Sequence, residues 1–231
     1  MSWIEAAKRR AARKAVEHVE SGFVVGLGSG STAAYVIRII GKRLRKGELK
    51  DVLGVATSRQ AASEAVEAGV PLTTLNEHHP LNLTVDGADQ IDVELNAIKG
   101  GGGALLREKV VASASESYIL VADETKMTEG LGEGCPLPVE VLPFALRPVL
   151  QRIGDLGAKA QARSGSGKVG PVVTDNGNVI IDADFGAIDD PRELETQLKA
   201  IPGVLETGLF LGYADTAYIG VEGGVKRLDR I

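Results

Sequence analysis

The chain has 231 residues, 44% of them hydrophobic and 25% charged, which is the composition of a globular protein and excludes a disordered or fibrous chain. Its formal net charge of −5 gives no general basic surface, so nucleic acid is not an expected partner and any anion-binding site must be local. No run reaches the roughly 18 apolar residues that a membrane-spanning helix needs, and the single cysteine, Cys135, excludes an internal disulfide, so we expect a cytoplasmic protein with no membrane partner.

The first half of the chain alternates between strand and helix patterns. Residues 23–27 and 52–56 are short, nearly all apolar and typical of buried strands, and the apolar residues between them recur at helical spacing. Thr57, followed by Gln60, has the signature of a capping box. A helix is therefore predicted to begin at Thr57 and to run toward Gly69.

Two further strands are predicted at 81–85 and 118–122, with a helix at about 104–115 between them. Strands that alternate with helices form a parallel sheet whose two faces are both covered. The prediction is an α/β protein with a Rossmann-like, mostly parallel sheet and helices on both faces.

The character of the sequence changes after Gly130, where glycines and prolines crowd a short interval that is typical of a crossing between domains. A smaller α+β domain is expected to follow. Its clearest element is a hairpin at 172–182, in which Asn176 and Gly177 supply the positive φ angles of a tight turn. A helix then opens at Asp190 and ends near residue 201.

The last part of the chain, 204–220, returns to apolar, strand-like segments and is expected to rejoin the first sheet. We therefore assign residues 1–130 and 206–231 to the larger α/β domain and residues 131–205 to the smaller domain.

The glycine-rich segment 26–33 leaves a strand and enters a helix, where backbone N–H groups and the positive end of the helix dipole favour an anion. The hydroxyls of Ser31 and Thr32 are able to bind phosphate oxygens as well. Two other interpretations are open: a turn that binds nothing, and a nucleotide site, because Gly28 begins a loose dinucleotide pattern. A Walker-type phosphate loop is excluded because no lysine follows the last glycine.

Two carboxylates, Asp86 and Asp89, directly follow the strand predicted at 81–85. They should therefore lie at the carboxyl edge of the parallel sheet, where open α/β folds bind ligands. The structural alternative is a turn in which Asp86 only caps the next segment.

The most informative run is 99–109, in which Lys99 precedes four consecutive glycines and Glu108 follows them on a helix. Four glycines cost much backbone entropy, so close approach of a ligand is a better explanation than regular structure. Glu108 lies on the same helical side as Leu105, and burial there would raise its pKa toward the range of a general base. The alternative is an exposed glutamate on a surface helix.

No metal site is expected. His18 belongs to the expected first helix, His78 and His79 lie in a loop, and no third ligand occurs at metal-site spacing. Cys135 has no evident base partner and is interpreted as a packed thiol.

Taken together, these segments resemble the ribose-5-phosphate isomerases of type A. The segments that carry the resemblance are 5–14, 26–33, 86–92, 99–109, Lys126 and 172–182. The sequence departs from the family at Ser29, where threonine is common, and at Gln90, where an acid is common. Neither change removes a group that the chemistry needs.

The resemblance implies that Glu108 is the catalytic base and that Lys99 lies beside the reacting oxygens. It implies that Asp86 and Asp89 form an acidic pair. The substrate-binding positions that it implies are Ser29, Gly30, Ser31, Thr32, Gly87, Ala88, Gly100, Gly101, Gly102, Lys126 and Lys8. A smaller domain of ferredoxin-like type is expected with it.

The function expected from this resemblance is the interconversion of ribose 5-phosphate and ribulose 5-phosphate through a cis-enediolate, in the non-oxidative pentose phosphate pathway, with no metal or organic cofactor. The partner is a phosphosugar, and a homodimer or homotetramer is implied. Two alternatives are a non-catalytic sugar-phosphate sensor, which would bind the substrate without converting it, and a nicotinamide-dependent dehydrogenase, which would bind that cofactor.

Overall fold

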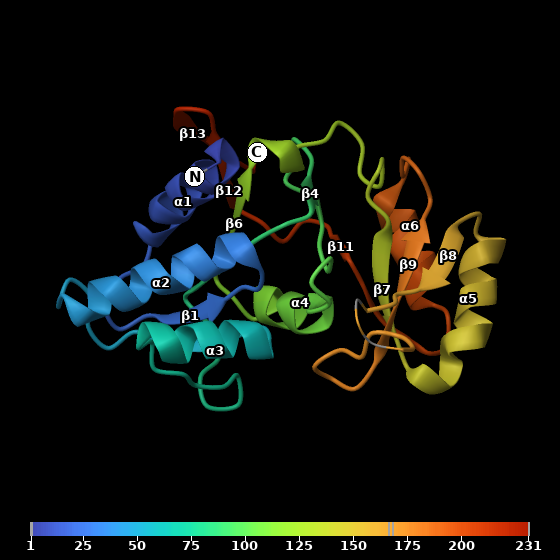
Figure 1. The fold of residues 1–231 in the computed structure, drawn as a ribbon, viewed down its shortest axis with the longest axis horizontal. Helices are drawn as coiled ribbons and strands as arrows, with labels where there is room; N and C mark the ends of the chain where they lie inside the picture. Colours follow the sequence, from blue (N-terminus) through green and yellow to red (C-terminus); the bar gives the residue numbers. More distant parts are fainter. Residues whose placement is uncertain (1, 166, 168, 231) are drawn as a thin grey trace.

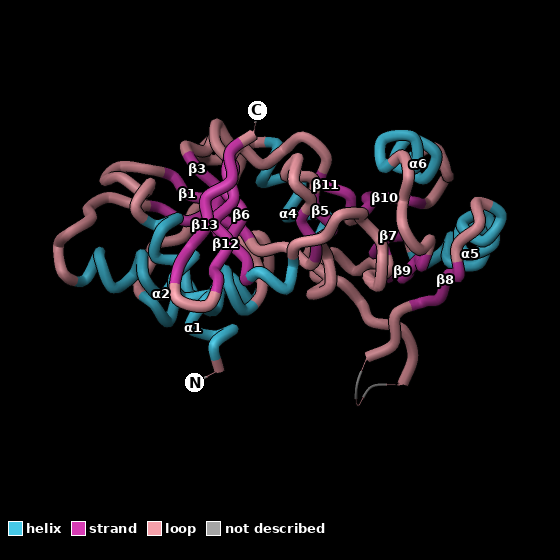
Figure 2. The backbone as a smooth tube through the Cα atoms, turned by 90° about the horizontal axis from the view of Figure 1, so that it is seen from above, coloured by secondary structure: helices cyan, strands magenta, loops and turns pink. Residues whose placement is uncertain are grey.

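The computed structural model describes residues 2–165, 167 and 169–230, which form three β-sheets with helices around them (Figures 1 and 2). The largest sheet has six strands in the order β13-β12-β6-β3-β1-β2. Only β12 and β13 are antiparallel neighbours. The strands are β1 (Val24–Leu27), β2 (Leu53–Ala56), β3 (Leu83–Asp86), β6 (Tyr118–Asp123), β12 (Thr216–Val221) and β13 (Gly224–Asp229).

Both faces of this sheet are covered, as the sequence predicts. Along β6, Ile119 and Val121 pack into a core shared with the first three helices, whereas Leu120 and Ala122 point into a second core on the opposite face. The helices of the larger unit are α1 (Trp3–Val16), α2 (Ser31–Arg45), α3 (Arg59–Ala68) and α4 (Leu105–Ser113). Ala112 of α4 belongs to the second core.

The smaller unit follows the order strand, helix, two strands, helix, strand, and its sheet order β10-β7-β9-β8 is fully antiparallel. This is the ferredoxin-like arrangement. Its elements are β7 (Leu137–Val141), α5 (Leu146–Asp155), β8 (Lys159–Ala162), β9 (Val179–Asp184), α6 (Pro191–Lys199) and β10 (Val204–Thr207). Both helices lie on the outer side of the sheet, away from the larger unit (Figure 1).

A three-stranded sheet in the order β11-β5-β4 lies between the two units (Figure 1). Its strands are β4 (Gln90–Ile91), β5 (Ala97–Ile98) and β11 (Leu209–Phe210). Short 3₁₀ turns, η1 (Glu124–Lys126) and η2 (Pro143–Ala145), complete the secondary structure. Among the described residues, no helix has the length and apolar character required to cross a bilayer.

Three local predictions need correction. The first helix ends at Val16, so His18 lies beyond it, with Nε2 2.7 Å from the hydroxyl of Tyr218. The third helix begins at Arg59 because Ser58, and not Thr57, caps it by accepting from the backbone N–H of Ala61.

The predicted hairpin at 172–182 also differs in detail. Before the turn, the chain makes only a single bridge, between Val173 and Val179. Gly177 has a positive φ of 82° but Asn176 does not, and the N–H of Gly177 donates to the carbonyl of Thr174. The turn is therefore a type I turn followed by a left-handed glycine, which needs one positive φ angle instead of two.

Candidate active site

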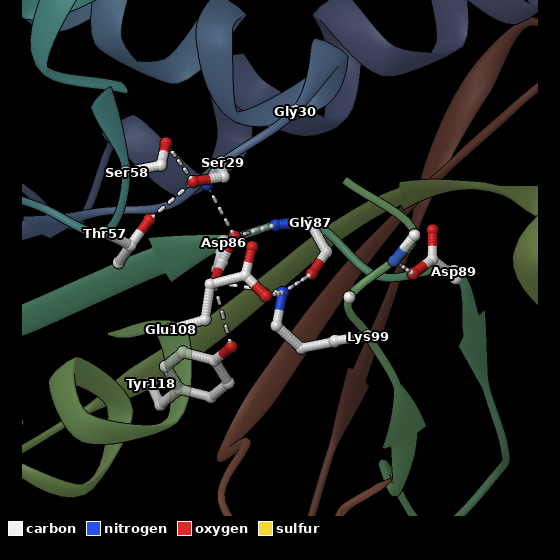
Figure 3. A network of polar contacts seen from close by, with 12 residues as sticks. Ser29, Gly30, Thr57, Ser58, Asp86, Gly87, Asp89, Lys99, Glu108 and Tyr118 are labelled. Atoms are coloured by element: carbon white, nitrogen blue, oxygen red, sulfur yellow. Dashed lines mark hydrogen bonds and ion pairs between the residues drawn. The ribbon is translucent and has the colours of Figure 1, made fainter. Parts of the chain in front are cut away.

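Three ionisable side chains from three elements meet at the carboxyl ends of the parallel strands. Asp86 is the last residue of β3, Lys99 follows β5, and Glu108 lies in the first turn of α4. The Nζ of Lys99 lies 3.0 Å from Oδ2 of Asp86 and 3.2 Å from Oε2 of Glu108 (Figure 3). The three residues are 0%, 2% and 4% exposed in chain order, so water screens these charges little.

Burial governs the protonation of this group. Burial raises the pKa of Glu108 to about 8. The Asp86 carboxylate also raises this pKa, whereas the positive charge of Lys99 lowers it. Burial also raises the pKa of Asp86, although the positive charge of Lys99 lowers it. Burial alone would lower the pKa of Lys99, but the two carboxylates outweigh it and raise that pKa above its usual range. The site thus combines a charged lysine with a carboxyl poised near neutral pH.

One carboxylate oxygen of Glu108 has spare capacity to accept a proton. Oε2 is buried and accepts no hydrogen bond from any described residue, because Lys99 approaches it as an ion pair without hydrogen-bond geometry. Glu108 lines a cavity. A buried carboxyl that lines a cavity and has an oxygen without a hydrogen-bond donor is suited to take a proton from a bound molecule.

Asp86 is held more rigidly. Its Oδ1 accepts from the backbone N–H groups of Ser29, at 3.1 Å, and Gly87, at 2.7 Å. The buried hydroxyl of Tyr118 donates to Oδ2 at 3.4 Å. A Cβ at Gly28 would lie 2.1 Å from Oδ1, so only glycine lets the β1–α2 turn pass this carboxylate.

The glycine run forms a loop whose backbone is fixed from the larger unit. Lys99 donates from Nζ to the carbonyl of Gly87, and Oδ2 of Asp89 accepts from the N–H of Gly101 at 2.7 Å. Gly100 has a φ of 101°, which side chains rarely adopt. The loop therefore brings its backbone close to Lys99 and Glu108.

The β1–α2 turn forms the other end of the site. The helix α2 begins at Ser31, and no side chain among the described residues caps it. Lys8 from α1 reaches this helix end, with Nζ 3.2 Å from the hydroxyl of Ser31 and 3.0 Å from Oε1 of Glu5. An uncapped helix N-terminus beside a lysine is an anion-binding arrangement.

A second turn, between β2 and α3, supports the first. The hydroxyl of Ser29 lies 2.8 Å from that of Thr57 and donates to that of Ser58 at 2.6 Å. The N–H of Gly30 donates to the side-chain carbonyl of Gln60 at 3.0 Å. Ser29 and Gly30 are thus already engaged with this turn.

A cavity of about 180 Å³ joins the two ends. Its lining contains most of the residues predicted from the sequence: Lys8, Ser29, Gly30, Ser31, Thr32, Gly87, Ala88, Asp89, Lys99, Gly100, Gly102, Glu108 and Lys126. Two predicted residues lie outside this lining. Asp86 contacts Lys99 but does not line this cavity, and Gly101 lines a neighbouring cavity.

Sequence reasoning missed several supporting residues. Tyr118 begins a predicted strand, but nothing in its neighbourhood shows that it reaches Asp86 on another strand. The sequence pattern assigns Thr57 and Gln60 to a helix cap, whereas their side chains contact Ser29 and Gly30. The polar character of the β2–α3 turn was the available signal.

The remaining candidates lie elsewhere. His78 and His79 are exposed. Cys135 lines the neighbouring cavity together with Arg163 and Asp182, and burial raises the pKa of its thiol.

Comparisons of the sequence and of the structure with known proteins both find ribose-5-phosphate isomerases. The family model described as ribose 5-phosphate isomerase A (phosphoriboisomerase A) matches residues 53–224. The ribose-5-phosphate isomerase A of Methanosarcina acetivorans is 50% identical over 224 residues, which cover 96% of this chain and 94% of that protein.

Solved structures agree over nearly the whole chain. A D-ribose-5-phosphate isomerase in complex with phospho-erythronic acid superposes with a TM-score of 0.97 at 43% identity, covering 100% of both chains. The ribose 5-phosphate isomerase A of Methanocaldococcus jannaschii gives a TM-score of 0.93 at 44% identity, covering 97% of this chain and 99% of the other.

Proposed function

The chain belongs to the ribose 5-phosphate isomerase A family and interconverts ribose 5-phosphate and ribulose 5-phosphate, and we propose that it does so through a cis-enediolate with Glu108 as the base. The observation that carries this proposal is the buried carboxyl of Glu108, which lines the cavity and lies 3.2 Å from the ammonium of Lys99. A base and a positive charge at one place are what proton transfer next to a carbonyl needs.

The proposed reaction uses one carboxylate twice. Glu108 takes the proton from C2 of the open-chain aldose, the electron pair of that bond forms the C1–C2 double bond, and the C1 carbonyl oxygen becomes negatively charged. Glu108 then returns the proton to C1, while the hydroxyl proton on O2 moves to O1 and leaves a ketone at C2. No atom is gained or lost.

Lys99 and Asp86 act on the oxygens in this proposal. Lys99 is held by Asp86 and Glu108, so its ammonium is fixed before the substrate binds and stabilises the enediolate without reorganising. Asp86 does not line the cavity and acts through Lys99, whose ammonium lies 3.0 Å from its Oδ2. Asp89 supports the loop through Gly101.

The phosphate is assigned to the opposite end of the cavity. Ser31 and Thr32 at the start of α2 and Lys8 beside them form that end, and Lys126 lines the same cavity, so that hydroxyl, N–H and ammonium donors are available. Binding the phosphate there orients C1 and C2 toward Glu108. The proposal extends to a cytoplasmic homodimer or homotetramer, an expectation based on the family resemblance and the single cysteine.

The test is Glu108→Gln. The amide keeps the shape of the side chain but cannot accept the C2 proton, so kcat should fall by roughly 10²–10⁴-fold. Exchange of the C2 proton in heavy water should fall with it, because both report enediolate formation.

The matched control is Glu116→Gln, since Glu116 is exposed and lies outside the cavity. It should leave turnover unchanged. Near-normal turnover in the Glu108 variant would refute the assignment of the base. Binding of ribose 5-phosphate by the unmodified protein without any product would favour the sensor instead.

A further inference from the structure

The glycine loop is also held from the smaller unit, by a residue outside the predicted site. Arg163 follows β8, and its Nη1 donates to the carbonyls of Gly100, at 2.8 Å, and Gly101, at 3.0 Å. The same guanidinium donates from Nε to Oδ2 of Asp182 at 2.9 Å and from Nη2 to Oδ1. Asp182 lies in β9.

The peptide unit between Gly100 and Gly101 is therefore hydrogen-bonded through both its C=O and its N–H. The C=O of Gly100 accepts from Arg163, and the N–H of Gly101, in the same peptide unit, donates to Asp89. Asp89 belongs to the larger unit and Arg163 to the smaller one. A run of four glycines has large conformational freedom, and these two contacts remove much of it.

Arg163 also binds the next peptide unit, between Gly101 and Gly102. The C=O of Gly101 also points at Arg163. Because the C=O and N–H of a trans peptide point in opposite directions, the N–H of Gly102 points away from Arg163. Gly102 lines the cavity with Lys99 and Glu108.

We propose that Arg163 is a positioning residue for the isomerisation: fixed by Asp182, it sets the conformation of the glycine loop and thereby the placement of Lys99 and of the Gly102 N–H. It touches no reacting atom. The bidentate ion pair with Asp182 uses Nε and Nη2, so that Nη1 remains free to donate to the loop. A lysine has a single nitrogen and could not make both sets of contacts in this geometry. This inference rests on the proposed function.

The experiment compares Arg163→Met, Arg163→Lys and Asp182→Asn with the unmodified protein. A displaced loop weakens stabilisation of the transition state, so we expect kcat of Arg163→Met to fall by roughly 10- to 100-fold. Inhibition by inorganic phosphate should change much less than kcat, because Arg163 does not line the cavity that contains Lys8, Ser31 and Thr32. Arg163→Lys and Asp182→Asn should give intermediate values of kcat.

Chemical rescue separates positioning from general stability. Guanidinium ion added to Arg163→Ala, below denaturing concentrations, should restore part of kcat, and it should restore nothing in Glu108→Gln. The matched control is Arg152→Met, an exposed arginine of α5 that should leave kcat and the melting temperature unchanged.

Wild-type kcat in Arg163→Met overturns the proposal. If that variant does not fold, wild-type kcat in both Arg163→Lys and Asp182→Asn overturns it. Absence of isomerase activity in the unmodified protein would instead refute the proposed function, so the two failures are distinguishable.

Discussion

At the scale of single residues, the chemistry depends on the buried surroundings of the Glu108 carboxyl. Burial disfavours its charged form, Lys99 favours it, and Asp86 disfavours it again, with the result that its pKa lies at about 8. A lone exposed glutamate would be fully ionised at neutral pH and a weak base. The same side chain is useful here because its surroundings raise its affinity for a proton.

This pKa predicts the pH dependence of catalysis. The base must be ionised, so kcat/KM should rise with pH and level off above about 8, falling about tenfold per pH unit on the acid side. Because Lys99 lowers the pKa of Glu108, Lys99→Met should move this limb to higher pH as well as reduce the rate. The measurement is a pH profile of kcat/KM for both proteins.

An acid limb near pH 6 would contradict the prediction. The second ionisation of a phosphate group falls at about that pH, and the profile would then report the substrate instead of Glu108.

At the scale of elements, α4 connects the site to the smaller unit. Glu108 faces the cavity, and the next residue, Lys109, is buried toward α6 and β10. The Nζ of Lys109 lies 2.8 Å from Oε1 of Glu195 and 2.9 Å from Oε1 of Glu206. Adjacent residues of one short helix thus serve catalysis and the attachment of the smaller unit.

The buried pairs of Lys109 should matter for stability. Lys109→Met leaves Glu206 without its buried partner, so the free energy of unfolding should fall by about 3 kcal/mol in urea titrations. Lys199 pairs with the same glutamate, at 2.8 Å, but is 40% exposed. Lys199→Met should therefore cost less than about 1 kcal/mol. Equal losses in the two variants would contradict the argument from burial.

The elements also show how far the sequence leads. The apolar runs and helical spacing locate the strands and helices of the larger sheet because they depend on local periodicity. Thr57 and Ser58 are adjacent and both able to cap, so the sequence could not decide which hydroxyl accepts from the first turn of α3. Ser58 does so, and both hydroxyls also contact Ser29. That choice depends on the neighbouring turn.

The residues of the site were predictable from the sequence only where a local pattern marks them. Glu108, Lys99 and Asp86 stand in unusual local contexts, such as the glycine run and a strand end. Tyr118 and Arg163 stand in ordinary contexts and reach the site only through the pairing of strands and the docking of the smaller unit. Contacts between residues far apart in the sequence leave no local pattern.

At the scale of the whole molecule, the cores of the two units are not separate. The core of the smaller unit contains Ile98 of β5 and Leu209 of β11, which belong to the three-stranded sheet between the units. The next residue, Phe210, packs into the core under the larger sheet. We propose the domain limits 1–130 with 206–231, and 131–205. Glu206 and Thr207 lie beyond the limit at 205 but complete β10 of the smaller sheet, and Ile98 and Leu209 stabilise the smaller domain from outside its limits.

This shared packing predicts that the two units unfold together. The single tryptophan, Trp3, lies in α1 and reports only on the larger unit, whereas far-ultraviolet circular dichroism reports on both. The two signals should give one coincident urea transition. Ile98→Ala removes a side chain buried in the core of the smaller unit and should lower the free energy of unfolding by about 2–5 kcal/mol. Both signals should shift together, because loss of the smaller unit exposes β5, β11 and the loop that carries Lys99. A dichroism transition in two steps, with Trp3 following only the second, would show that the units are independent.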